Sequence, residues 1–220
     1  MPPSTSLASA PSPDRADPWS LASLEGFYRI HAHVYDLTRP FLLFGRAQAV
    51  QRLALAPDAR VLDVGCGTGW SLPLLHETGA RVIGIECSEP MRRQALRRLQ
   101  RHLLERSVVL DPRPYGTHAR YARSVDGILF SYSLSMIPPF EVTIARARED
   151  LRQGGRIAVL DFLDAREPVH CALRSSHVYL GPERLEALAQ TFPHHQVEIR
   201  SVGLWRYFLF VGEADEPTEH

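Results

Sequence analysis

The chain has 220 residues, 45% of them hydrophobic, and its 25 basic and 25 acidic side chains give a formal net charge of zero. Such a length suits one domain with a full core, and the balanced charge excludes a global attraction to nucleic acid. No run of about 18 apolar residues predicts a membrane span, and the N-terminus lacks the apolar core of a secretion signal. We therefore expect a cytoplasmic protein.

The basic and sulfur-containing side chains exclude several kinds of site. Every basic residue is an arginine, which excludes a P-loop lysine, Schiff-base chemistry and pyridoxal phosphate anchoring. The cysteines Cys66, Cys87 and Cys171 are odd in number, without a CxxC motif or a recognisable Cys/His cluster. We therefore expect neither a disulfide framework nor a metal site.

The pattern along the chain predicts an α/β fold. Residues 1–18 are rich in Pro, Ser and Ala and predict a disordered tail, whereas 20–55 predict two helices. Strands and helices then alternate, which is typical of a Rossmann-like, doubly wound, mostly parallel sheet. The expected strands are 60–65, 81–86, 107–110, 125–132 and 156–162, the expected helices are 69–78, 90–105, 139–152 and 182–192, and an antiparallel edge pair is expected at 195–202 and 206–213. One domain over 19–213, followed by a flexible tail at 214–220, fits this pattern.

The loop "VLDVGCGTGW" after the first strand is the expected ligand site, because ligands of such sheets bind beyond the carboxyl ends of the strands. Gly65, Gly67 and Gly69 permit close approach of the backbone, but their spacing is not the G-x-G-x-x-G of dinucleotide sites. The carboxylate of Asp63 would repel a pyrophosphate and attract an ammonium or sulfonium group. Glu86, which ends the second strand, could accept hydrogen bonds from both hydroxyls of a ribose. S-Adenosylmethionine fits this description.

Three stretches carry a family resemblance: "VLDVGCGTG", "VIGIECSEPM" and "LRQGGRIAVLDF" resemble class I S-adenosylmethionine-dependent methyltransferases. The resemblance implies that the glycine loop contacts the methionine part with help from Asp63, that Glu86 takes the ribose, and that Cys87, Met91 and Asp111 lie beside the adenine. The cofactor-binding candidates are Tyr35, Arg39, Asp63, Gly65, Cys66, Gly67, Thr68, Gly69, Glu86, Cys87, Met91, Asp111, Ser131 and Ser133.

Two further stretches, "YRIHAHVYDLTRPFLLFGR" and "FSYSLSMIPPF", resemble the betaine-lipid synthesis methyltransferases, relatives of bacterial phosphatidylethanolamine N-methyltransferases. This resemblance implies N-methylation of a lipid headgroup such as diacylglyceryl-homoserine, and an N-terminal helix that covers the site as a lid. Tyr28, His31 and Tyr35 share one stripe of that helix, which is either a cation-binding aromatic face or the packed face of a docked helix. Tyr28, His31 and Tyr132 are the catalytic candidates, and Arg39 could pair with the methionine carboxylate.

Other functions remain open at this point. The same cofactor could donate its 3-amino-3-carboxypropyl group, the acceptor could be a soluble small molecule, or the chain could be a nucleoside-binding regulator without turnover. The arginine-rich face of the helix at 90–105 is either a solvated surface or a peripheral contact with anionic lipid.

Overall fold

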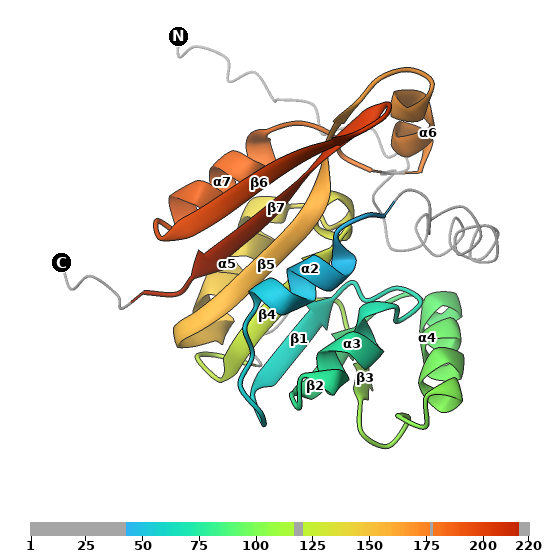
Figure 1. Cartoon of the computed structure of the whole chain (residues 1–220), viewed down its shortest axis with the longest axis vertical. Helices are drawn as coiled ribbons and strands as arrows, with labels where there is room; N and C mark the ends of the chain where they lie inside the picture. The colour runs from blue at the N-terminus through green and yellow to red at the C-terminus, as the bar shows by residue number, and fades with distance from the viewer. Residues whose placement is uncertain (1–42, 117–120, 177, 216–220) are drawn as a thin grey trace, which may run out of the picture.

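The strands form one mixed sheet (Figure 1). The computed structural model describes residues 43–116, 121–176 and 178–215, within which the sheet has the order β3-β2-β1-β4-β5-β7-β6. The strands are β1 Arg60–Val64, β2 Arg81–Ile85, β3 Val109–Asp111, β4 Val125–Ser131, β5 Leu151–Ala165, β6 His195–Val202 and β7 Trp205–Glu213. β1 to β5 pair in parallel, and β7 is antiparallel to both β5 and β6. The expected fold class, with its antiparallel edge pair, is confirmed.

The strand order places the ligand-binding edge. After β1 the chain adds β2 and β3 on one side, and then returns to add β4 on the other side. The connections on either side of β1 therefore diverge, and in sheets of this kind ligands bind outside the carboxyl ends of the strands at that point. The loop that follows β1 lies at this switch point.

Helices cover both faces of the sheet (Figure 1). On one face, side chains of α2 Arg46–Arg52, α3 Ser71–Glu77 and α4 Glu89–Arg101 share one apolar cluster with the sheet. On the other, α5 Phe140–Asp150 and α7 Glu183–Thr191 share a second cluster. The 3-10 turn η2 Leu134–Met136 follows β4, and α6 Val169–Ser175 follows β5.

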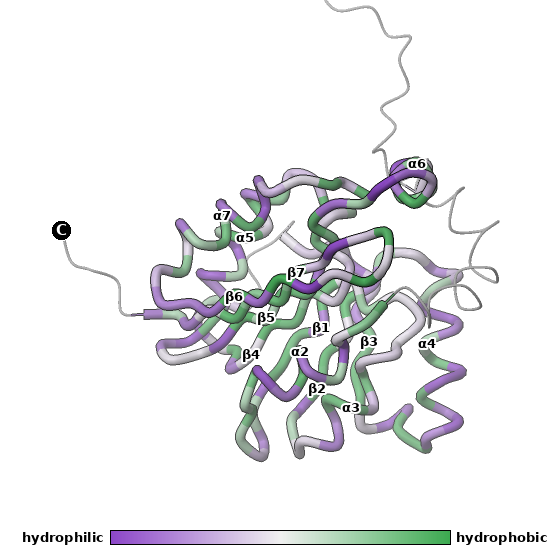
Figure 2. Tube along the Cα trace, turned by 45° about the horizontal axis from the view of Figure 1, so that its top comes forward, coloured by the Kyte–Doolittle hydropathy of each residue, from purple (hydrophilic) through white to green (hydrophobic). Residues whose placement is uncertain are grey.

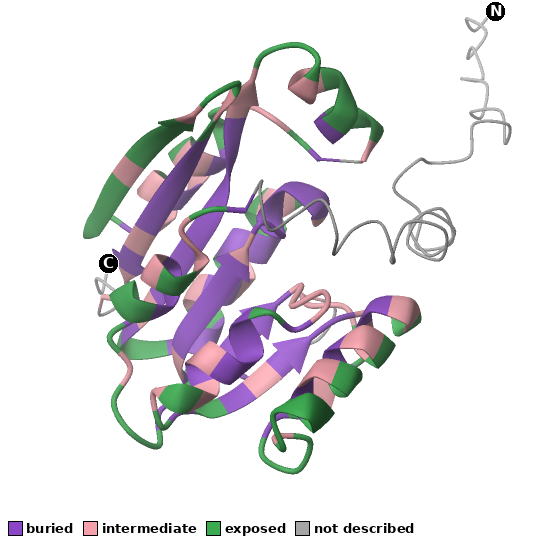
Figure 3. Cartoon of the chain, turned by 45° about the vertical axis from the view of Figure 1, so that its right-hand side comes forward, coloured by how far each residue is buried: buried purple, intermediate pink, exposed green. Residues whose placement is uncertain are grey.

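Burial explains why the central strands are apolar on both faces. Val61, Leu62 and Val64 of β1 are fully buried, with Val61 in one cluster and Leu62 and Val64 in the other. Figure 2 shows apolar residues running through the central strands, whereas Figure 3 shows exposed residues on β6 and on the outer face of α4. No helix within the described ranges is long and apolar enough to cross a bilayer.

Several element boundaries differ from the sequence predictions. The helix expected at 90–105 ends at Arg101, and β5 begins at Leu151 rather than at Arg156. The Gly154–Gly155 pair looks like a break, but both residues belong to β5, because Gly154 donates to Ala214 O and Ala214 donates to Gly155 O, each at 2.8 Å. Pairing with Ala214 therefore continues the strand through two glycines that, from the sequence alone, predict a break. α6 was not expected, and the expected tail at 1–18 and first helix lie outside the described residues.

Candidate functional site

The loop after β1 is held in a conformation that favours glycine. Gly65, Gly67 and Gly69 have φ values of 67°, 57° and 76°. A Cβ on Gly65 would lie 2.6 Å from the Cβ of Ser133, whereas a Cβ on Gly67 would meet nothing within 4 Å. Gly65 is therefore needed for close packing, and Gly67 borders open space. The backbone N–H groups of Gly65 and Cys66 both donate to Ile85 O, at 2.8 and 3.1 Å, which fixes the loop to the end of β2.

Asp63 is buried at the end of β1, and neither of its carboxylate oxygens has a hydrogen-bond partner among the described residues. Burial raises the pKa of Asp63 to about 7; the Arg46 guanidinium opposes this rise, and the Glu86 carboxylate adds to it. A buried carboxylate without donors costs free energy in its charged form. A cation at this position would remove that cost.

Glu86 follows β2 and connects the two loops at the carboxyl edge of the sheet. Its Oε2 accepts the Gly67 N–H at 3.0 Å and its Oε1 accepts the Ser88 N–H at 2.8 Å. Burial raises the pKa of Glu86, and these two backbone bonds oppose the rise. Each oxygen keeps a lone pair for a further donor. Nη1 of Arg92 fixes the same turn, because it donates to Glu86 O and Cys87 O at 2.9 and 2.6 Å.

Asp111 ends β3, one strand further from β1 than Glu86. Of Asp63, Glu86 and Asp111, it accepts the most hydrogen bonds from described residues. Its oxygens accept the backbone N–H, Nε–H and Nη2–H of Arg113 at 2.9 Å each, and the Tyr121 hydroxyl lies 3.3 Å away. The side chain lines a hollow of about 560 Å³ together with Arg60, Arg113 and Tyr121. Its backbone oxygen accepts the Glu86 N–H at 3.0 Å, so Asp111 supports the turn that carries Glu86.

The end of β4 closes over the glycine loop. The Ser133 hydroxyl donates to Val64 O at 2.6 Å, which places β4's extension directly against the end of β1. Tyr132, at φ 56°, donates its hydroxyl to Phe44 O at 2.8 Å and is almost fully buried. Ser131 Oγ is buried without a partner among the described residues. The hydroxyls of Tyr132 and Ser133 therefore both bond to backbone oxygens.

The comparisons with known proteins agree with this geometry. A family model described as "Methyltransferase domain" matches residues 41–213, which is most of the chain. The chain belongs to this methyltransferase family. It is an S-adenosylmethionine-dependent methyltransferase, as the glycine loop and its two carboxylates predict.

Two curated relatives share this family character. The chain is 29% identical over 178 residues to a demethylmenaquinone methyltransferase of Tropheryma whipplei (strain Twist), covering 78% of this chain and 72% of that one. It is 32% identical over 130 residues to a trans-aconitate 2-methyltransferase of Variovorax paradoxus, covering 58% of this chain and 48% of that one. Neither of these two relatives is named as a betaine-lipid enzyme, so the narrower resemblance is not confirmed by them.

Solved methyltransferase structures share the fold. A Haemonchus contortus phosphoethanolamine N-methyltransferase, solved with phosphomonomethylethanolamine and S-adenosylhomocysteine, superposes with a TM-score of 0.74 at 15% identity, over 88% of this chain and 60% of that chain. Geranyl diphosphate C-methyltransferase of Streptomyces coelicolor, also with S-adenosylhomocysteine, gives a TM-score of 0.67 at 16% identity, over 92% of this chain and 86% of that chain. At this identity the likeness concerns the fold.

The residues present fit S-adenosylmethionine. Asp63 offers a cationic group a buried carboxylate that has no hydrogen-bond partner among the described residues, Glu86 offers acceptors for hydroxyls, and Gly67 borders open space. Met91 is buried beneath this turn, at the start of α4. The side chain of Cys66 faces the sheet instead, since a Cβ on Gly84 would lie 3.0 Å from its Sγ. Cys66 can therefore contribute backbone groups to the loop but not its thiol.

Two residues near the candidate site were not among the sequence predictions. The guanidinium of Arg46 lies 5.2 Å from the ring centroid of Trp70 and 6.0 Å from that of Tyr132. Trp70 is 40% exposed, and its position directly after Gly69 is the signal in the sequence that points to it. Nothing in the sequence separates Arg46 from the other arginines. The candidates Tyr28, His31, Tyr35 and Arg39 lie outside the described residues.

Proposed function

We propose that this methyltransferase methylates the amine of a lipid headgroup of the diacylglyceryl-homoserine type. The observation that carries this proposal is the chemistry of the segment after β4. Residues 132–140, "YSLSMIPPF", contain no carboxylate, histidine or lysine. The hydroxyls of Tyr132 and Ser133 donate to backbone oxygens, and that of Ser135 donates to the fully buried Asp161. An acceptor that meets this segment must attack with a lone pair of its own, which a neutral amine does without a base.

The remaining residues would hold the two substrates in line. S-Adenosylmethionine supplies an electrophilic methyl group on a positively charged sulfur. We assign Asp63 to the cationic part of the methionine moiety, the loop from Gly65 to Gly69 to its backbone contacts, and Glu86 to the ribose hydroxyls. Cys87, Met91 and Asp111 remain proposed neighbours of the adenine. Orientation and exclusion of water then account for catalysis.

The aromatic side chains would favour a cationic product. Tyr132 and Trp70 already accept the Arg46 guanidinium on their ring faces, and Tyr28 and Tyr35 would add such faces if the N-terminal helix acts as a lid. Since the Tyr132 hydroxyl donates to a backbone oxygen, its proposed contribution comes from the ring rather than from proton transfer. We also propose a single domain over 19–213.

A second candidate is methylation of a soluble or quinone acceptor. It is favoured by the names of the two relatives, which act on demethylmenaquinone and on trans-aconitate. Aminocarboxypropyl transfer would use the same cofactor site with a different carbon facing the acceptor.

Labelled S-adenosylmethionine separates these functions. The full chain is incubated with a lipid extract, a water-soluble extract, demethylmenaquinone or trans-aconitate, and Asp63→Ala serves as the control without cofactor binding. We expect label in an amino-lipid and S-adenosylhomocysteine as by-product. Label confined to another acceptor would refute the lipid assignment, and methylthioadenosine would indicate aminocarboxypropyl transfer.

A lipid acceptor also gives the basic stripe of α4 a role at an anionic membrane. Arg93, Arg97 and Arg101 are exposed and spaced four residues apart, so they share one face of the helix. Replacing all three by Gln should weaken binding to anionic vesicles at low salt. The matched control replaces the exposed Arg81, Arg152 and Arg200, which removes the same charge elsewhere. Equal binding of both triple variants would exclude a specific role for α4.

A further inference from the structure

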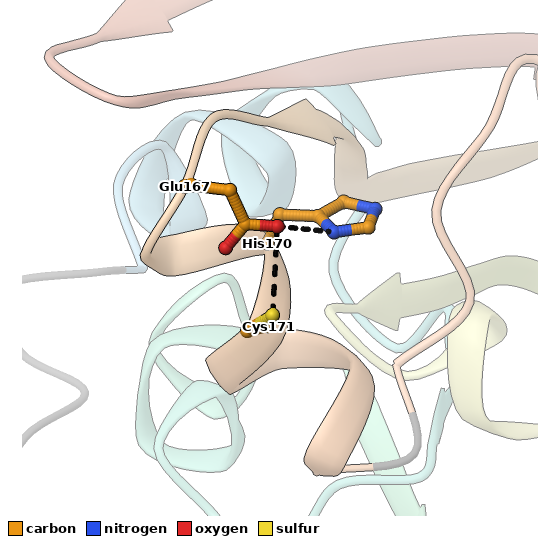
Figure 4. Close-up of side chains that lie close together, drawn as sticks. All are labelled: Glu167, His170 and Cys171. Atoms are coloured by element: carbon orange, nitrogen blue, oxygen red, sulfur yellow. Dashed lines mark hydrogen bonds and ion pairs between the residues drawn. The ribbon is translucent and has the colours of Figure 1, made fainter.

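A cluster of three different metal-ligand side chains lies at the start of α6, outside the proposed cofactor site. Glu167, His170 and Cys171 each offer one ligand atom, and these atoms all lie within 4.8 Å of one another. Figure 4 shows a carboxylate oxygen of Glu167 between the imidazole of His170 and the sulfur of Cys171. Glu167 lies in the turn just before α6, and His170 and Cys171 belong to the first turn of that helix.

The distances within the cluster match those between ligands of a tetrahedral ion. Oε1 of Glu167 lies 3.2 Å from Nδ1 of His170 and 3.5 Å from Sγ of Cys171. Bond lengths to Zn²⁺ of about 2.3 Å for sulfur and about 2.0–2.2 Å for nitrogen and oxygen imply tetrahedral edges of about 3.3 Å for N···O and about 3.5 Å for S···O. Two edges of a tetrahedron are therefore already formed by the side chains.

We propose that Glu167, His170 and Cys171 bind one zinc ion, with the fourth position open to water. Sulfur, imidazole and carboxylate ligands together suit Zn²⁺ better than Mg²⁺ or Ca²⁺, which prefer oxygen alone. The spacing of the cysteines predicted no metal site. The sequence shows no CxxC motif or Cys/His cluster of the usual kind, and Glu167 approaches Cys171 because the unexpected helix α6 begins there.

The ion would stabilise the short helix α6. α6 has seven residues, of which only Leu173 is buried, and a helix this short is marginal in water by itself. The chain leaves β5 at Ala165, and it returns where Tyr179 donates to Ser135 O at 3.0 Å. Figure 1 shows α6 beyond the end of β5. Zinc would therefore stabilise the segment that follows β5 and that bonds back to Ser135, just after β4, a structural role that does not depend on the identity of the acceptor.

Cobalt substitution tests the proposal on the full-length protein. Titration with Co²⁺ should give one saturable equivalent with a thiolate-to-cobalt charge-transfer band, and Zn²⁺ should remove the band. Cys171→Ser should abolish the band, and His170→Gln and Glu167→Gln should each weaken binding at least about tenfold, since even loss of an outer partner costs about 10–100-fold. Circular dichroism verifies that the variants fold.

The matched controls are Cys87→Ser and His194→Gln, which change the same residue types outside the cluster. Both should retain the band and the affinity. A band that survives Cys171→Ser, or wild-type protein without saturable binding, overturns the site.

Discussion

Two aspartates of the sheet, Asp63 on β1 and Asp161 on β5, are both 0% exposed, yet their surroundings differ completely. Asp161 accepts the backbone N–H of Ser135 at 2.7 Å, the Ser135 hydroxyl at 2.8 Å and the Phe162 N–H at 2.8 Å. Asp63 has no such donor among the described residues. Burial raises the pKa of both carboxyls, but only Asp161 has hydrogen bonds that oppose the rise.

The difference separates a structural carboxylate from one that requires a ligand. Asp161 is also near the buried guanidinium of Arg184, which lowers its pKa and donates Nη2–H to Phe162 O at 2.8 Å. This network connects η2, β5 and α7, whereas Asp63 leaves its oxygens unsatisfied beside the glycine loop. Equal burial therefore says little about function, and the presence or absence of donors says much more.

The largest expected effect is the loss of stability on replacing Asp161. Asp161→Ala should lower the free energy of unfolding by about 3–5 kcal/mol, because the buried Arg184 loses its counter-charge and two backbone N–H groups lose their acceptor. Urea unfolding measures the change, and Asp161→Asn, which keeps the shape, should lose less. A loss below about 1 kcal/mol for the alanine variant would mean that Asp161 is not the centre of this network.

The second prediction concerns Asp63. Asp63→Asn should weaken S-adenosylmethionine binding about 100-fold, or about 2.7 kcal/mol, and Asp63→Ala should abolish it, because the carboxylate that faces the cationic moiety is lost. Isothermal calorimetry measures both. Asp161→Asn is the matched control and should bind within about threefold of the wild type if it folds. Undiminished binding by Asp63→Ala would refute the proposed cofactor site.

The third prediction is that the free energy of unfolding depends on pH through Asp63, by at most about 1.4 kcal/mol per pH unit. Because the pKa of Asp63 is raised from 3.8 to about 7, the folded chain holds a proton that the unfolded chain has lost between these values. The contribution of Asp63 to stability therefore falls as pH rises from about 4 to about 7. Urea unfolding of wild type and Asp63→Asn, compared at pH 5, 6, 7 and 8, isolates this group from the other buried carboxyls.

The outcome of that comparison is directional. Without the cofactor, the variant should gain stability relative to the wild type as pH rises, and the gain should level off above about pH 7. Adding the cofactor should stabilise the wild type more than the variant, because the wild type binds it more tightly. A stability difference that does not change with pH would mean that Asp63 titrates normally in the folded chain.

Local patterns predicted the sheet and half of the candidate site. Asp63, the glycine loop and Glu86 come from two neighbouring strand–loop units, so their association follows from the alternation of strands and helices. Asp161 could have been noticed as a charged residue within the apolar strand "RIAVLDF". Its two donors on Ser135 could not, because Ser135 approaches Asp161 only through the pairing of β4 with β5.

The other half of the site depends on contacts between distant parts of the chain. Ser133 closes over Gly65 because β4 packs beside β1, and Arg46 reaches Trp70 and Tyr132 because α2 lies on the same face as α3. Such contacts follow from packing between distant segments, which a sequence window of about ten or twenty residues does not contain. The same reason explains why β5 extends through two glycines.

The smallest expected effect concerns Tyr132, which lies just after β4, the strand between the two aspartates. Tyr132→Phe should lower the free energy of unfolding by about 0.5–1.5 kcal/mol, because Phe44 O loses its donor while the ring keeps its contact with Phe162 at 4.7 Å. With the acceptor identified in the labelling experiment, kcat should change by less than about threefold. A proton-transfer role for the hydroxyl would instead lower kcat by about 100-fold or more. Tyr132→Leu removes the ring as well and should lose activity. Because the hydroxyl is absent from both variants, the difference between them assigns the contribution of Tyr132 to its aromatic face.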